Sequence, residues 1–129
     1  MKLQVRKLQE SDWSFIPEWW KSNKQDNSIE NLRDFLPGSF QIGDYEEKRS
    51  GLGGFMVCKE DDPIAAAWLV MTNSNCAIIT NIISDLSYRD KDKEKALKLL
   101  NNFVNNFAKE LGYKHTIQLV ENTKLVKKL

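Results

Sequence analysis

The sequence has 129 residues, of which 41% are hydrophobic and 29% are charged, and its formal net charge is +1. These values are typical of an ordinary soluble globular protein, and the length predicts one domain over residues 1–129 rather than two. A charge this close to zero argues against nucleic acid and against an anionic membrane as partners. The N-terminus has no apolar signal core, and no run approaches the ~20 apolar residues of a membrane span, so we expect a cytoplasmic protein.

The first third of the chain predicts a strand followed by two short helices. Residues 2–8 alternate in polarity, which is typical of a strand. Ser11 or Asp12 offers an N-cap for a helix whose apolar residues recur at helical spacing. Pro17 should kink or restart that helix. A second short helix is expected over residues 29–35.

The middle of the chain predicts a hairpin and then a buried strand. The hairpin strands are residues 55–59 and 64–72, joined by a turn over residues 60–63. Residues 76–84, "CAIITNIIS", form a near-continuous apolar run, which is typical of a strand buried on both faces.

The last third predicts a long amphipathic helix, a strand and a final helical segment. Apolar residues recur at helical spacing between about 93 and 111, and Gly112 is well placed to terminate that helix. Residues 114–120 alternate as a strand. The order is therefore β-α-α-β-β-β-α-β-α, an α/β mixed sheet. Its first strands should be antiparallel, and the strands flanking the long helix should be parallel because of a right-handed crossover.

A loop of alternating charges, "RDKDKE", joins the buried strand to the long helix. Unpaired backbone N–H groups and the helix dipole make such a junction a natural anion site, and Arg89 and Lys91 could strengthen it. Asp90, Asp92 and Glu94 also suit a helix N-terminus and could occupy the site themselves. The loop is therefore either a phosphate-binding loop without glycine or a solvated helix cap, and its formal charge does not decide between them.

This order of elements and this loop resemble the GNAT superfamily of acyl-CoA-dependent N-acetyltransferases. The family loop has the pattern R/Q-x-x-G-x-G/A after the fourth strand, and "YRDKDKEKA" lies at that place. Arg89 falls on the motif arginine, whereas Asp92 and Glu94 replace the two small residues. The segments "GLGGFMV", "PIAAAW" and "IISDLSYRDKD" are also similar to a divergent branch of such proteins.

The resemblance implies a function and a cofactor site. The function would be an N-acyltransferase that moves an acetyl group from acetyl-CoA to a primary amine of a small molecule or protein, without a metal. Backbone groups near Ile82 and Ser84, and Asn122, would bind the pantetheine arm in a gap between the fourth and fifth strands. The pyrophosphate would bind the amides of Arg89, Asp90, Lys91, Asp92, Lys93 and Glu94.

Catalysis carries over less well, and no catalytic residue is assigned. Thr80 and Asn81 stand where many relatives have a glutamate, and Leu129 stands at the position of their tyrosine. The usual final hairpin is missing from the sequence, which leaves open a truncated chain end or a second subunit in a homodimer. The alternative function is therefore a CoA-binding or protein-interaction module of the same fold without turnover.

Several other residues favour structural roles. The four tryptophans indicate core or an acceptor-pocket wall, with Trp19 or Trp20 open as a substrate contact. His115 shares a face with Ile117 and is expected to be packed. "GLGG" lacks the features of a nucleotide loop and predicts a hinge or turn. The two cysteines are expected to be free thiols, and no Cys/His cluster indicates a metal site.

Overall fold

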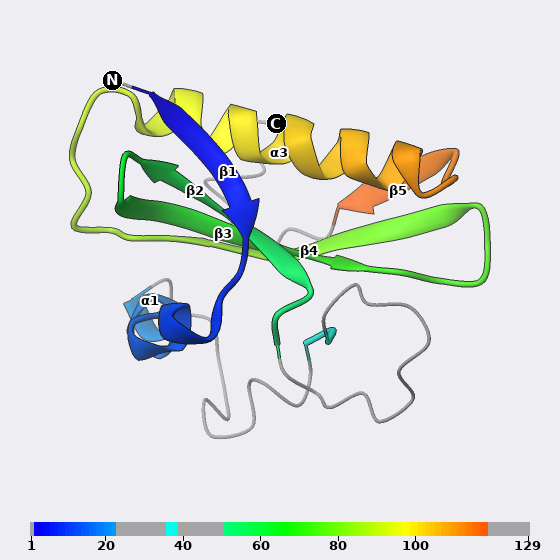
Figure 1. The fold of residues 1–129 in the computed structure, drawn as a ribbon, viewed down its shortest axis with the longest axis horizontal. Coiled ribbons are helices and arrows are strands. Elements are labelled where there is room, and N and C mark those ends of the chain that lie inside the picture. The colour runs from blue at the N-terminus through cyan, green and yellow to red at the C-terminus, as the bar shows by residue number, and fades with distance from the viewer. Residues whose placement is uncertain (1, 23–35, 39–50, 119–129) are drawn as a thin grey trace.

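The computed structural model describes residues 2–22, 36–38 and 51–118 (Figure 1). The predicted helix over residues 29–35 and the predicted final helical segment lie outside the described residues. Among the helices that are described, none has the length and apolar character needed to cross a lipid bilayer. The elements are, in chain order, β1 (Leu3–Lys7), the 3-10 helix η1 (Glu10–Ser14), α1 (Ile16–Ser22), β2 (Gly54–Lys59), β3 (Asp62–Val70), β4 (Cys76–Ser84), α3 (Lys93–Glu110) and β5 (His115–Gln118).

The described strands form one mixed sheet in the order β1-β2-β3-β4-β5. The first three pairings are antiparallel, whereas β4 and β5 are parallel in a register from Cys76–His115 to Ile79–Gln118. This arrangement confirms the predicted α/β mixed sheet and its parallel pair. The bounds of β4 coincide with the predicted strand, and the β2–β3 turn is shorter than predicted because Lys59 already pairs with Asp62.

One face of the sheet is covered by α3, which runs along it in Figure 1. The helix buries a stripe at a spacing of four residues, Ala96, Leu100, Val104 and Ala108. That spacing places the four side chains on one side of an α-helix. The buried Phe55 of β2 faces this helix, and its ring lies edge-on to two phenylalanines of α3 at centroid distances of 4.9 and 5.1 Å.

The opposite face of the sheet is covered by α1 (Figure 1). Trp19 and Trp20 are buried there against Met56 of β2 and the fully enclosed Trp68 of β3. The indole N–H of Trp68 donates a hydrogen bond to the carbonyl oxygen of Gly51 at 2.8 Å. A buried tryptophan needs such a partner for its only polar atom. The core interpretation of these three tryptophans is confirmed.

The chain enters α1 through a helical break at the predicted proline. η1 ends at Ser14, and α1 begins at Ile16 with Pro17 in its first turn. The first N–H groups of a helix have no partner within the helix, so a proline costs no hydrogen bond there. The prediction that Pro17 restarts the helix is therefore confirmed.

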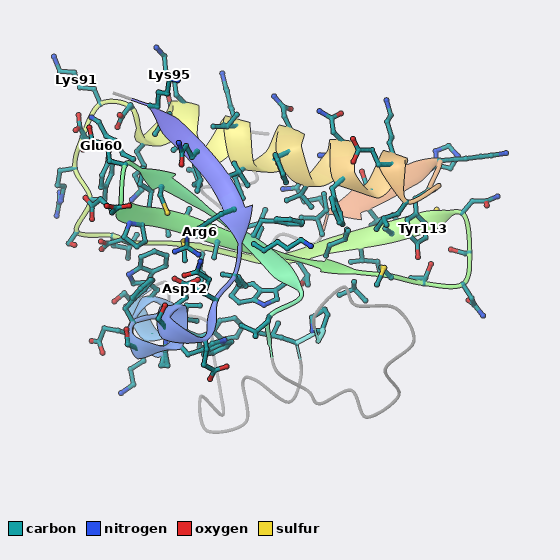
Figure 2. The ribbon with its side chains drawn as sticks, viewed as in Figure 1. Arg6, Asp12, Glu60, Lys91, Lys95 and Tyr113 are labelled. Carbon is teal, nitrogen blue, oxygen red and sulfur yellow. The ribbon has the colours of Figure 1, made fainter. Side chains whose placement is uncertain are left out.

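The predicted N-cap at Ser11 or Asp12 is wrong, because the helical segment begins earlier, after Gln9. The Asp12 carboxylate, only 2% exposed, instead makes two bonds of 2.8 Å to the Arg6 guanidinium of β1. It also accepts the backbone N–H of Gln9 at 2.8 Å. Figure 2 shows the Arg6 and Asp12 side chains directed toward each other between β1 and η1. A buried carboxylate requires such a partner, so this pair ties η1 to the sheet edge.

Of the two alternatives predicted for the "GLGG" segment, a hinge or a turn, the structure favours the turn, because the chain bends at Gly51 and Gly53, Gly51 has φ +69°, and the segment is tightly packed. A Cβ atom added to Gly54 would lie 2.3 Å from the carbonyl oxygen of Ala67, and one added to Gly53 would lie 2.2 Å from that of Gly38. The Gly53 N–H also donates to the Pro37 carbonyl oxygen at 2.9 Å. Glycine is required here because backbone approaches backbone more closely than any side chain permits.

We predict that Gly54→Ala lowers the free energy of unfolding by about 2 kcal/mol or more, because the new methyl group collides with backbone inside the sheet. Gly112→Ala is the matched comparison. Gly112 has φ +101° and open space around it, so only the left-handed backbone opposes the change, at about 1 kcal/mol. Urea unfolding followed by circular dichroism measures both, and a loss at Gly54 no larger than that at Gly112 would contradict the packing argument.

Candidate functional site

The fourth strand contains a β-bulge at its centre. Trp68 of β3 pairs with Thr80, whereas Ala66, two residues earlier, pairs with Ile83. β4 therefore advances three residues while β3 advances two, which is the signature of a bulge. The bulge lies between Thr80 and Ile83 of β4. At this point the regular hydrogen-bond ladder between β3 and β4 is disturbed.

The bulge also reverses which face of the sheet each side chain meets. Ile79 and Ile82 pack with the cluster beneath α3, whereas Ile83 packs with the cluster beneath α1. The strand therefore buries side chains on both faces, as its apolar run predicted. Of the predicted pantetheine contacts, Ile82 lies within the bulge, and Ser84 is the last residue of β4, paired with Ala65.

The loop after β4 is organised first by Asp85. Its carboxylate accepts the backbone N–H of Ser87 at 2.9 Å and also the Ser87 hydroxyl. Its carbonyl oxygen accepts the backbone N–H of Tyr88 at 3.0 Å and the ammonium group of Lys93 at 3.1 Å. These bonds form a local turn at the strand end, so the loop takes its shape without glycine.

Two acidic side chains of the loop are held by one lysine from β2. The Lys59 ammonium nitrogen lies 3.0 Å from a carboxylate oxygen of Asp90 and 3.0 Å from one of Asp92. The Tyr88 hydroxyl donates to the other oxygen of Asp92 at 2.7 Å. We call Lys59, Tyr88, Asp90 and Asp92 the loop clamp.

Sequence reasoning missed Lys59, which lies 31 residues before Asp90. A signal was nevertheless present in the predicted topology. Two successive antiparallel pairings make β2 and β4 run in the same direction, so their carboxyl ends lie at the same edge of the sheet. A lysine that ends β2 is therefore brought close to the loop that follows β4.

The clamp shifts the pKa values of its members. Hydrogen bonds to Asp90 and Asp92 raise the pKa of Lys59. Burial and the bond to Asp92 raise the pKa of Tyr88 to about 12. The bonds that Asp92 receives from Tyr88 and Lys59 lower its pKa. At neutral pH the lysine is therefore charged, the tyrosine protonated and the Asp92 carboxylate ionised.

The N-terminus of α3 is only partly occupied by the loop's own acids. Asp92 is the N-cap residue, yet its side chain makes no capping hydrogen bond. Asp90 does accept the backbone N–H of Lys91 at 2.8 Å. Within the described part of the chain, no hydrogen bond engages the backbone N–H groups of Arg89, Asp90 and Asp92. The helix-cap alternative thus fails for Asp92, whereas Asp90 occupies the Lys91 amide with its carboxylate and the Lys93 amide with its carbonyl oxygen.

The surface around this junction is positive. Arg89, Lys91 and Lys95 are exposed, and none of them makes an ion pair with another described residue. Figure 2 shows Lys91 and Lys95 projecting away from the ribbon. From Arg89 to Lys95 the formal charge is +1, and the Lys59 ammonium raises the charge of the cluster to +2. Exposed cations beside unbonded amides are the features that bind a phosphate.

The fifth strand corrects one prediction and leaves others untested. His115 and Ile117 are exposed, whereas Thr116 and Gln118 are half-buried. The prediction of a packed His115 is therefore wrong, because the other set of alternating side chains of β5 faces the protein. Thr116 is held instead, because its hydroxyl donates to the side chain of Asn105 on α3. Asn122 and the expected gap between β4 and β5 lie beyond Gln118, outside the described residues.

Neither cysteine adds a reactive group to this site. Both are free thiols, as predicted, and Cys58 is buried. Burial raises the pKa of the Cys58 thiol, which disfavours the nucleophilic thiolate. Across residues 2–22, 36–38 and 51–118, no three His, Cys, Asp or Glu side chains are grouped so that they could hold a metal ion.

No family model and no curated protein matches the sequence. Solved structures do match the fold. N-acetylglutamate synthase from Neisseria gonorrhoeae, complexed with coenzyme A and N-acetyl-glutamate, is 13% identical over 99% of this chain, with a TM-score of 0.68. This chain spans only 27% of that synthase. PaiA N-acetyltransferase from Thermoplasma acidophilum, in complex with coenzyme A, is 16% identical over 99% of this chain and 86% of its own, with a TM-score of 0.65.

A GCN5-related N-acetyltransferase from Kribbella flavida also matches, with 12% identity over 86% of this chain and 67% of its own and a TM-score of 0.61. Identities of this size speak for the fold alone. The mixed sheet, its parallel β4–β5 pair and the crossover helix agree with that result. The chain therefore has the GNAT fold, that of the GCN5-related N-acetyltransferases, which confirms the resemblance found in its sequence.

Proposed function

We propose that this protein is an N-acyltransferase that moves an acetyl group from acetyl-CoA to a primary amine of a small molecule or protein. The observation that carries the proposal is the β4–α3 junction, where unbonded amides and exposed cations meet. Two proteins of the same fold, from Neisseria gonorrhoeae and Thermoplasma acidophilum, were crystallised with coenzyme A. The fold and the junction together support coenzyme A as the ligand.

The start of α3 would hold the diphosphate of the cofactor. The amides of residues 89–94 would supply the donors, although the Lys93 N–H already donates to the Asp90 carbonyl oxygen at 3.3 Å. The side chains of Arg89 and Lys91 would add charge-assisted bonds. The Lys91 amide contributes only when the Asp90 carboxylate releases it. Glycine is dispensable where residues take ordinary dihedral angles, and the described loop has no residue with positive φ between Asp85 and Lys93.

The bulged strand would hold the pantetheine arm. Such an arm carries amide groups that need backbone partners, and the bulge at Ile82 disturbs the regular ladder between β3 and β4 there. Ser84 continues the same strand toward the loop. Asn122 completes the proposed set, although it lies outside the described residues.

The protein would contribute to the reaction mainly by orienting the acceptor amine and the thioester. Acetyl-CoA, when bound, supplies an activated thioester. β4 carries no carboxylate or imidazole, since Thr80 and Asn81 stand near its centre, so the strand offers no general base. The acceptor amine must lose its proton to water or to a residue elsewhere. Holding amine and thioester together can still lower the barrier by about 7 kcal/mol in favourable cases.

Isothermal titration with acetyl-CoA tests the ligand. We expect the wild-type protein to bind, and Arg89→Ala to weaken binding by about tenfold because a charge-assisted bond to phosphate is lost. Lys114→Ala is the matched control, since it removes one positive charge beside the start of β5, at the other end of the sheet. Absence of heat at high micromolar acetyl-CoA would contradict the proposed ligand.

A thiol-release assay over a panel of primary amines tests turnover. We expect at least one amine to accelerate the release of coenzyme A thiol above the rate of hydrolysis. The alternative is a CoA-binding module without turnover, which the missing base on β4 favours. Binding of acetyl-CoA without thiol release for any amine would support that alternative, and loss of both would support a protein-interaction module.

A further inference from the structure

We propose that Lys59 is a positioning residue that keeps the diphosphate site at the start of α3 accessible, by holding the Asp90 and Asp92 side chains away from it. The inference rests on the proposed function, because it concerns the site that would bind the cofactor. It assigns a role in cofactor binding to a residue of β2 that lies outside the loop.

The contacts of Asp92 carry the first step. An aspartate at the N-cap position normally bonds the backbone N–H of the second or third helical residue. Asp92 has that position and makes no such bond. Its two carboxylate oxygens are instead bonded to Lys59 at 3.0 Å and to Tyr88 at 2.7 Å. The loop clamp therefore diverts the natural cap of α3 and leaves the helix N-terminus available to another anion.

The position of Lys59 carries the second step. Its backbone pairs with Leu3 of β1 on one side and with Asp62 of β3 on the other, so it is anchored in the interior of the sheet. Its side chain is 18% exposed and that of Asp92 is 22% exposed, so solvent screens their contact less than it would a fully exposed pair. The lysine is thus presented to the loop by a rigid strand.

Electrostatics give the third step. A diphosphate is repelled by any carboxylate that lies within the same loop, and Lys59 neutralises two of them at once. Removing Lys59 would restore that repulsion and free Asp92 to cap the helix. Both effects oppose the ligand, and together they should weaken its binding by roughly tenfold.

A second interpretation is that the loop clamp only maintains the shape of the loop. An experiment must distinguish this interpretation from the proposed role of Lys59. In that case, replacing Lys59 or replacing Asp90 and Asp92 would weaken the binding of coenzyme A equally. If Lys59 acts by neutralising and diverting the acids, replacing Asp90 and Asp92 by neutral residues should make coenzyme A bind more tightly. The two interpretations thus give opposite results for the same broken contact.

The test is a double-mutant cycle read by titration calorimetry with coenzyme A. The four proteins are the wild type, Lys59→Met, Asp90→Asn/Asp92→Ala, and the triple variant. We expect Lys59→Met to raise Kd about tenfold in the wild-type background and less than about twofold in the Asp90→Asn/Asp92→Ala background. The Asp90→Asn/Asp92→Ala protein should bind more tightly than the wild type, because two carboxylates that repel the diphosphate are removed while the Lys59 ammonium remains. Lys59→Arg should retain binding, because it keeps the charge.

Lys114→Met controls for loss of a positive charge elsewhere, and far-ultraviolet circular dichroism confirms that each variant is folded. A wild-type protein that binds no coenzyme A would overturn the proposed function and this inference with it. Normal wild-type binding would leave the function standing. In that case the inference alone fails if Lys59→Met has no effect, if its loss is equal in both backgrounds, or if Asp90→Asn/Asp92→Ala weakens binding as much as Lys59→Met does.

Discussion

The parallel pairing of β4 with β5 is the constraint on which the rest of this structure depends. Two parallel neighbours cannot be joined by a tight turn, so the chain must cross the face of the sheet before it returns. α3 is that crossover, and it must begin close to the end of β4. The N-terminus of a helix therefore lies at one edge of the sheet. The candidate site is a consequence of this connection.

The bulge in β4 and the clamp on its loop adapt this edge in different ways. The bulge disturbs the hydrogen-bond ladder near Ile82 and changes which face of the sheet the following side chain meets. The clamp changes the charge of the loop, because Lys59 offsets two carboxylates that would otherwise face an anion. One feature thus concerns hydrogen bonds along the strand and the other concerns charge at its end. Both features lie between the centre of β4 and the start of α3.

The two faces of the sheet are packed by different sets of side chains, and the packing on each face explains a local feature of the sequence. Under α3 the buried stripe of the helix is small and aliphatic, with Ala96 and Ala108 allowing the helix to lie close to the strands, and Phe55 packs against two phenylalanines of the helix. Under α1 the contacts are aromatic, with Trp68 enclosed at the centre. Gly54, the first residue of β2, approaches the backbone of Ala67 more closely than a side chain would allow. What reads as a flexible motif in sequence is a packing requirement.

The sequence by itself determined the strands, the long helix, the parallel pair and the place of the charged loop. Hydrophobic periodicity and proline and glycine chemistry act over a few residues, so they can be read without a structure. Only the tertiary structure decided that Asp12 pairs with Arg6, that His115 faces outward and that Lys59 reaches Asp90 and Asp92. These outcomes depend on register and on which strand ends share an edge of the sheet. A sum of charges along the chain cannot contain them, because the deciding partner lies 31 residues away.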